Sequence, residues 1–290
     1  MLTEAQIEHY NVFGFVILRG LLTPDEITTA DNEFNSRLAY ARENTDLRGI
    51  RKQLNWTNLG PDSPFLGSLL EDPRFHEPAK QLLEGDVVGM YANGNAFASD
   101  RTEWHPDTGF LDRRGVKFAF YLQPLDGDTG AIRFVPGSHR APLHTNIREN
   151  VRLKETNKGV VDETGLEVDE VPAFVAASEP GDVIAFDNRV WHASWGGGSE
   201  RKMCSVGYFA APTSDDDEAA VRERAEQEAS LIEASPLVRR PAHWISNPDH
   251  NPIRQKWIDF LRENGFTGFE DGNHPSIHEP GSGSHSGQGK

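Results

Sequence analysis

Residues 182–211 read DVIAFDNRVWHASWGGGSERKMCSVGYFAA, and this stretch decides the fold. It contains two β-prone segments, Asp182–Phe186 and Met203–Ala210, which are separated by turn residues and a glycine run. Segments of this length that end in turn residues are typical of strands rather than helices. The stretch therefore predicts two short strands, with His192 and Arg201 in the connection between them.

The same pattern extends upstream to Val87. Further β-prone segments lie at Val87–Ala98, Val116–Leu122, Ala131–Val135 and Val171–Val175. Short strands in series favour a β-sandwich or a jelly-roll barrel. The sequence thus predicts a mainly β fold with flanking helices, in which the jelly-roll core covers about residues 87–211.

Helix signals flank this core. Thr3 with Gln6, and Thr23 with Glu26, form capping patterns at which helices begin. Further helices are expected at residues 27–43, 73–83, 214–234 and 251–265. We expect residues 1–270 to form a single domain and residues 271–290, with their prolines and Gly-Ser run, to be a disordered tail.

The composition limits the classes of partner. The chain has 290 residues and a formal net charge of −16, which opposes binding to nucleic acid or to anionic membrane surfaces. No apolar run reaches the roughly 20 residues that a membrane-spanning helix needs, and the amino terminus lacks a signal-peptide pattern. We therefore expect a cytoplasmic protein, a monomer or a homodimer, that acts on a small-molecule substrate. The single cysteine, Cys204, is interpreted as a packing residue.

Three residues form a candidate metal site. Of the eleven histidines, only His105 begins a His-x-Asp or His-x-Glu triplet, and Asp107 completes it. On an extended segment, residues two apart point to the same face, so this imidazole and carboxylate can bind one ion. His192, after the strand at 182–186, is the best third ligand. Two histidines and one carboxylate suit iron(II) and leave other coordination positions open.

Arg201 follows His192 by nine residues and begins an apolar strand. Its planar guanidinium could bind the remote carboxylate of a keto acid that chelates the metal. His139 and Arg148 have the same spacing, but a polar segment follows them, so this pair ranks lower. The competing interpretation is a β-sandwich with scattered histidines that only make local hydrogen bonds.

At these residues the sequence resembles the phytanoyl-CoA dioxygenase family of iron(II)- and 2-oxoglutarate-dependent oxygenases. The resemblance rests on Trp104–Asp107, on the segment Gly130–His139 and on the opening Phe13–Val16. It implies a double-stranded β-helix, which is a jelly-roll, cupin-like barrel. It also implies iron(II), 2-oxoglutarate and O2 as cofactors, with release of succinate and CO2 and, most simply, hydroxylation of an unactivated C–H bond.

Carried over to this chain, the resemblance gives metal roles to His105, Asp107 and His192 and a 2-oxoglutarate role to Arg201, and makes His139 a structural loop residue. Because Asp107 is present, halogenation is not expected. The interval before Arg201 is two residues shorter than in many relatives, which leaves open which other residues hold 2-oxoglutarate.

Further candidates are less specific. Ser194 and Asn93 could contact 2-oxoglutarate, and Phe110, Arg114 and Trp195 could contact substrate. Core packing is an equal or better explanation for Phe110 and Trp195, and solvated surface charge is the favoured explanation for Arg114. The segment 145–168 is a candidate lid. Two other functions stay open at this point: a non-catalytic ligand-binding jelly roll and a zinc hydrolase.

Overall fold

The computed structural model describes residues 1–45, 53–97, 101–151, 154–156, 159–161, 171–198 and 201–270. The predicted disordered tail, 271–290, lies outside the described residues, as do residues 152–153, 157–158 and 162–168 of the candidate lid. Within them, no helix is both long and apolar enough to cross a membrane.

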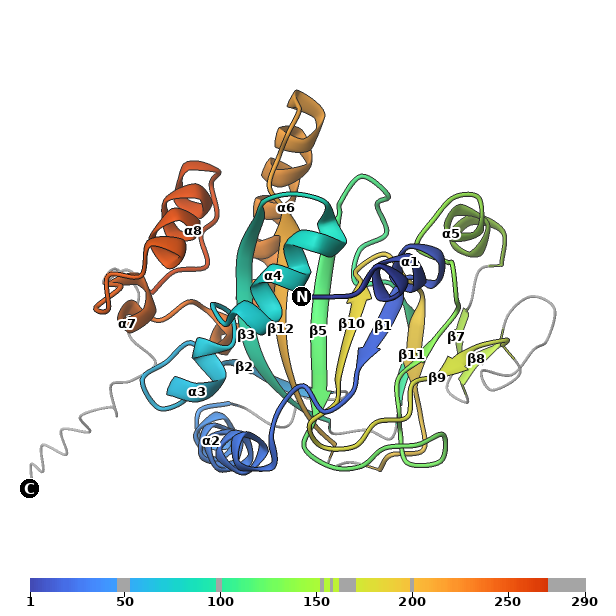
Figure 1. Ribbon diagram of the computed structural model, residues 1–290, viewed down its shortest axis with the longest axis horizontal. Helices are drawn as coiled ribbons and strands as arrows, with labels where there is room; N and C mark the ends of the chain where they lie inside the picture. The colour runs from blue at the N-terminus through green and yellow to red at the C-terminus, as the bar shows by residue number, and fades with distance from the viewer. Residues whose placement is uncertain are drawn as a thin grey trace, which may run out of the picture.

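Two antiparallel sheets form the centre of the described structure (Figure 1). The large sheet has the order β1-β10-β5-β12-β3-β2. Its strands are β1 (Phe15–Leu18), β2 (Gln53–Thr57), β3 (Val87–Phe97), β5 (Gly115–Tyr121), β10 (Val183–Asp187) and β12 (Lys202–Ala210). The small sheet consists of β4 (Thr102–His105), β11 (His192–Ser194), β6 (Arg133–Phe134) and β9 (Phe174–Val175), in that order. A separate pair contains β7 (Lys154–Thr156) and β8 (Gly159–Val161).

The predicted jelly-roll fold is confirmed: in the described residues, two facing sheets form it without closing into one continuous barrel. Four predicted strands match β3, β5, β10 and β12 closely, and the other two are shorter than predicted. The segment 131–135 keeps only β6, and the Ala131 N–H donates to the carbonyl oxygen of Asp126 in the preceding turn.

Side-chain alternation along the large sheet produces two apolar layers. On β5, Phe118 and Phe120 belong to the cluster beneath the helices, whereas Ala119 and Tyr121 belong to the cluster between the sheets. Because successive strand residues point to opposite faces, Lys117 shares the inner face with Ala119. The inner face is therefore where a site between the sheets can form.

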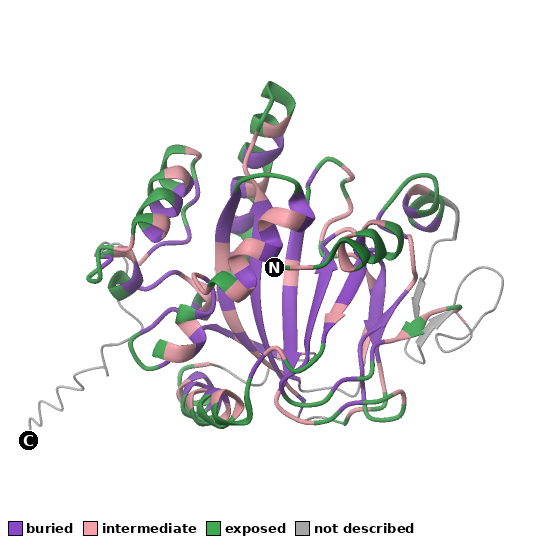
Figure 2. Cartoon of the chain, viewed as in Figure 1, coloured by how far each residue is buried: buried purple, intermediate pink, exposed green. Residues whose placement is uncertain are grey.

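Helices pack around the two sheets, and Figure 2 shows buried strands beneath helices whose outward faces are exposed. They are α1 (Glu4–Phe13), α2 (Pro24–Glu43), α3 (Pro64–Ser68), α4 (Pro73–Leu83), α5 (Leu143–Asn146), α6 (Asp215–Ala234), α7 (Ala242–Ile245) and α8 (Pro252–Glu263), with a π-helical turn at Ile147–Val151 and a 3-10 turn at Pro236–Val238. The predicted capping boxes at Thr3 and Thr23 begin α1 and α2. On α4, Phe75 packs edge-on against Phe118 of β5.

Candidate metal centre and adjoining cavity

Adjacent strands bring the three predicted ligands together. His105 ends β4 and pairs in register with His192, the first residue of β11. Asp107 follows β4 by two residues. One potential ligand atom from each of these three side chains lies within 4.8 Å of the others. The antiparallel pairing of β4 with β11 thus brings together residues that are far apart in sequence.

Backbone carbonyls orient both imidazoles. Nδ1 of His105 lies 2.7 Å from the carbonyl oxygen of Glu103, and Nδ1 of His192 lies 2.9 Å from that of Val190. A neutral histidine that donates from Nδ1 has its lone pair on Nε2. Each ring is therefore fixed in the tautomer that can bind a metal through Nε2.

The electrostatics favour the ligating forms. Burial lowers the pKa of His192 to about 3, and the neighbouring His105 acts in the same direction. Burial opposes ionisation of Asp107, but the positive charge of Lys117, with that of the two imidazoles when they are protonated, outweighs it and holds the carboxyl pKa at about 2. Nζ of Lys117 donates to both carboxylate oxygens, at 3.0 and 3.2 Å. At neutral pH the site presents a neutral His192 imidazole and an Asp107 carboxylate, a donor set that fits iron(II).

Arg201 is buried beside this centre. Its Nη1 donates to Ser194 Oγ at 2.8 Å and to the carbonyl of Gly130 at 2.9 Å, and its guanidinium lies 4.2 Å from the ring centroid of Phe97. Ser194 lies two residues after His192 on β11, so both point to one face, roughly 6–7 Å apart along the strand. That separation suits a short dicarboxylate with one end at the metal and the other at Arg201.

A cavity of about 390 Å³ adjoins Asp107. Asp107, Lys117 and the predicted Asn93 line it from the strand side, and Arg224 of α6 lines it from the opposite side. The cavity is partly open to solvent.

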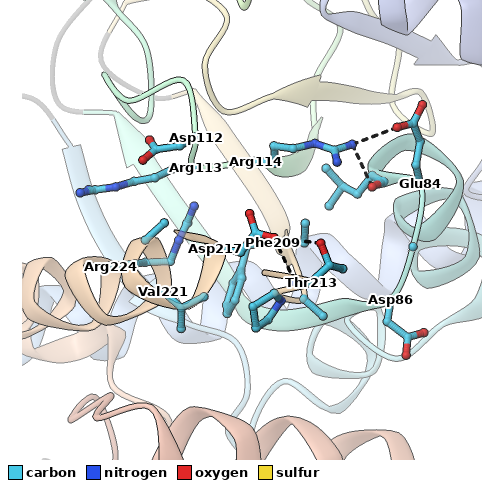
Figure 3. Close-up of a pocket in the computed structure, with 16 residues that line it drawn as sticks. Glu84, Asp86, Asp112, Arg113, Arg114, Phe209, Thr213, Asp217, Val221 and Arg224 are labelled. Carbon is cyan, nitrogen blue, oxygen red and sulfur yellow. Dashed lines mark hydrogen bonds and ion pairs between the residues drawn. The ribbon is translucent and has the colours of Figure 1, made fainter. Parts of the chain in front are cut away.

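The three residues predicted to contact substrate lie elsewhere. Phe110 is 45% exposed beneath the guanidinium of Arg113, and Trp195 packs under Arg133. Arg114 lines a second hollow, of about 340 Å³, where it donates to the carbonyl of Leu83 and pairs with Glu84 (Figure 3). Among the described residues that line the cavity beside Asp107, none of the predicted three occurs.

His139, the rival metal ligand, is held away from the centre. Its Nε2 lies 3.2 Å from the carbonyl oxygen of Asn11, and its ring packs against Gly14, where an added Cβ would come within 2.7 Å of Nδ1. His139 therefore packs against the end of α1 and against Gly14, which follows it.

Sequence reasoning missed several of the residues that line the cavity, among them Asn188 and Arg224. Asn188 carried a weak signal, since it lies in the turn four residues before His192. Arg224 carried none, because α6 is charged on several sides and its sequence does not reveal which side faces the cavity.

Comparison with known proteins supplies a family. A family model described as phytanoyl-CoA dioxygenase (PhyH) matches residues 10–203, which confirms the resemblance predicted from the sequence. The ectoine dioxygenase of Bordetella bronchiseptica is 24% identical over 221 residues, covering 67% of this chain and 70% of that protein. An ectoine dioxygenase from Streptomyces anulatus is 25% identical over 152 residues, covering 47% and 51%.

Solved structures share the fold. HygX from Streptomyces hygroscopicus, with nickel and 2-oxoglutarate bound, has a TM-score of 0.55 and 20% identity, covering 73% of this chain and 88% of that one. AviO1 from Streptomyces viridochromogenes Tue57 has a TM-score of 0.55 and 18% identity, covering 74% and 98%.

Proposed function

Because this chain belongs to the phytanoyl-CoA dioxygenase family, we propose that it oxidises, most simply by hydroxylation, an unactivated C–H bond of a small molecule. The family is one of iron(II)- and 2-oxoglutarate-dependent dioxygenases, and iron(II), 2-oxoglutarate and O2 are its cofactors. The observation that carries the proposal is the convergence of His105, Asp107 and His192 within 4.8 Å beside an open cavity.

Each residue has a part in this function. His105, Asp107 and His192 would hold the iron, and Arg201 with Ser194 would hold the remote carboxylate of 2-oxoglutarate. When bound, iron and 2-oxoglutarate supply the oxidising power by using O2 while the keto acid is converted to succinate and CO2.

The protein's contribution is orientation. Lys117 fixes the Asp107 carboxylate through both of its oxygens, so the ligand's direction is set before a metal binds. The substrate would lie in the 390 Å³ cavity, whose walls would hold the reacting C–H bond toward the metal side.

The proposal is tested by Asp107→Ala. Removing the only carboxylate of the three-residue set should abolish oxygen-dependent succinate formation from 2-oxoglutarate in iron(II)-loaded protein, with or without candidate substrates. Asp216→Ala is the matched control, because Asp216 is exposed in the first turn of α6. Unchanged succinate formation in Asp107→Ala would refute the assignment.

The wild-type protein decides between the alternatives. Oxygen-dependent succinate release that requires iron(II) and is inhibited by zinc(II) would exclude the zinc hydrolase. Metal binding without succinate release, with any small molecule offered, would instead favour the non-catalytic ligand-binding protein.

A further inference from the structure

Among the described residues, one positively charged side chain that lines the cavity beside Asp107 has no carboxylate at ion-pair distance. Lys117 is paired with Asp107, and Arg240 is paired with Glu228 at 2.6 Å. Arg224 also lines the cavity, yet within the described part of the chain no carboxylate lies at ion-pair distance from it; its guanidinium contacts the ring of Phe209. The cavity wall therefore carries a net positive charge in a chain whose formal net charge is −16.

The surroundings of Arg224 make this charge costly. Burial lowers the pKa of Arg224 to about 10, and the neighbouring charge of Arg113 acts in the same direction. In Figure 3 the two side chains lie near each other, Arg224 on α6 and Arg113 on the loop before β5. Arg113 has its own partner, Glu223. Arg224 stays charged at neutral pH, so an anion bound to it would offset the cost of burying its charge and would weaken its repulsion from Arg113.

The opposite wall is rich in amides. Asn55, Asn93 and Asn188 line the cavity, and the side-chain oxygen of each is buried without a hydrogen-bond partner among the described residues. Buried polar atoms normally have hydrogen-bond partners. A ligand in the cavity could therefore donate the hydrogen bonds that these three side-chain oxygens lack. An amide both donates and accepts, and hydroxyl groups do the same.

We propose that the substrate is a small hydroxylated anion whose carboxylate or phosphate binds Arg224 and whose hydroxyl groups bind the three asparagines. This inference rests on the proposed function, because it assigns the cavity to the substrate of the adjoining metal centre. The fixed anion at α6 would set which carbon of the molecule lies nearest the metal. Sugar acids and sugar phosphates are members of this chemical class.

Binding without turnover tests the proposal. Isothermal titration calorimetry would use the full chain with iron(II) and 2-oxoglutarate under anaerobic conditions, so that no oxidation occurs. The probes are D-gluconate with its uncharged counterpart sorbitol, D-glucose 6-phosphate with glucose, and hexanoate as an anion without hydroxyl groups. We expect at least one hydroxylated anion to bind about tenfold tighter than its uncharged counterpart and tighter than hexanoate.

Variants assign the preference to one residue. Arg224→Gln should remove it, and Arg224→Lys, which keeps the charge, should retain part of it. Arg222→Gln is the matched control, because Arg222 lies on the same helix with 59% of its side chain exposed and pairs with Glu218. Thermal unfolding of each variant checks that the fold is intact.

Several outcomes would overturn the inference. These are no preference for either hydroxylated anion, equal binding of hexanoate, a preference that survives in Arg224→Gln, or loss of 2-oxoglutarate affinity in that variant. Anion binding that depends on Arg224 in a protein that forms no succinate would refute only the proposed function. Succinate formation without such binding would refute only the substrate class.

Discussion

Arg201 illustrates how a buried charge is accommodated residue by residue. Two glycines line its side chain: an added Cβ would lie 2.2 Å from its Cδ at Gly197 and 2.6 Å at Gly130. The guanidinium is held by Ser194 and by the carbonyl of Gly130, and its face rests on Phe97. A glycine-lined channel fixes the alkyl chain, and the planar head keeps the geometry that a carboxylate needs.

Arg201→Lys tests the predicted 2-oxoglutarate role. Lysine keeps the charge but loses the planar fork, so KM for 2-oxoglutarate should rise about tenfold or more while iron(II) affinity stays the same. The measurement is succinate formation against 2-oxoglutarate concentration, with Arg222→Lys on exposed α6 as the control. An unchanged KM would remove Arg201 from the 2-oxoglutarate site.

At this scale the sequence predicts residues that belong to a spaced motif. His105, Asp107 and His192 could be predicted because a triplet and a strand context restrict the choices, and the structure brings them together. Residues that line the cavity could not. Arg222 is exposed while Arg224, two positions away on the same helix, faces the cavity, and only the packing of α6 distinguishes them.

At the scale of elements, the start of α2 shows the same contrast between a feature that the local sequence predicts and a contact that it does not predict. The capping box was readable from sequence: the Thr23 hydroxyl accepts from Glu26 N–H, and the Glu26 carboxylate accepts from Thr23 N–H at 2.8 Å. The contact with α4 was not readable, because nothing in the local pattern indicates that Arg74 reaches Glu26 at 2.7 Å. The Arg74 hydrogen bond lowers the pKa of Glu26 to about 2.

Glu26→Gln separates the charge from the cap. Glutamine preserves the capping box, so the variant loses mainly the ion pair, which at this partly exposed site is worth roughly 1 kcal/mol or less. Because the pKa of Glu26 is lower in the folded protein, its ionised carboxylate stabilises the fold at pH values above the unfolded pKa of about 4.5. This stabilisation is lost as the pH falls toward the folded-state pKa of about 2.

Urea unfolding at pH 7, 5 and 3.5 measures this effect. Wild type should be more stable than Glu26→Gln at pH 7 and 5, and the difference should shrink at pH 3.5. Glu4→Gln is the control, because Glu4 is an exposed acid in the first turn of the other capping-box helix. A difference that does not change with pH would contradict the assignment to the Glu26 charge.

Across the whole molecule, the metal centre and one side of the cavity come from different parts of the chain. The family match ends at residue 203, whereas α6, which supplies Arg224, begins at Asp215. Figure 1 shows α6 beside the large sheet near β3 and β12. Arg240 joins these parts, because it pairs with Glu228 of α6 and donates to the carbonyl of Met90 on β3. The part of the chain that the family model matches thus holds the candidate metal ligands and the asparagines on one side of the cavity, and the segment after it adds Arg224 on the other side.

Glu228→Gln should therefore loosen that wall. The side chains of Glu228 and Arg240 are only 9% and 4% exposed, and breaking a buried pair by removing one partner costs about 3–5 kcal/mol. Urea unfolding should show a loss of that order, and hydrogen exchange should rise across α6.

Glu218→Gln, which breaks the exposed pair with Arg222 on the same helix, should cost less than about 1 kcal/mol. If Glu228→Gln costs no more than this control, Glu228 and Arg240 do not hold α6. Replacing both partners, as Glu228→Gln with Arg240→Met, should recover part of the loss, because no buried charge is then left unpaired.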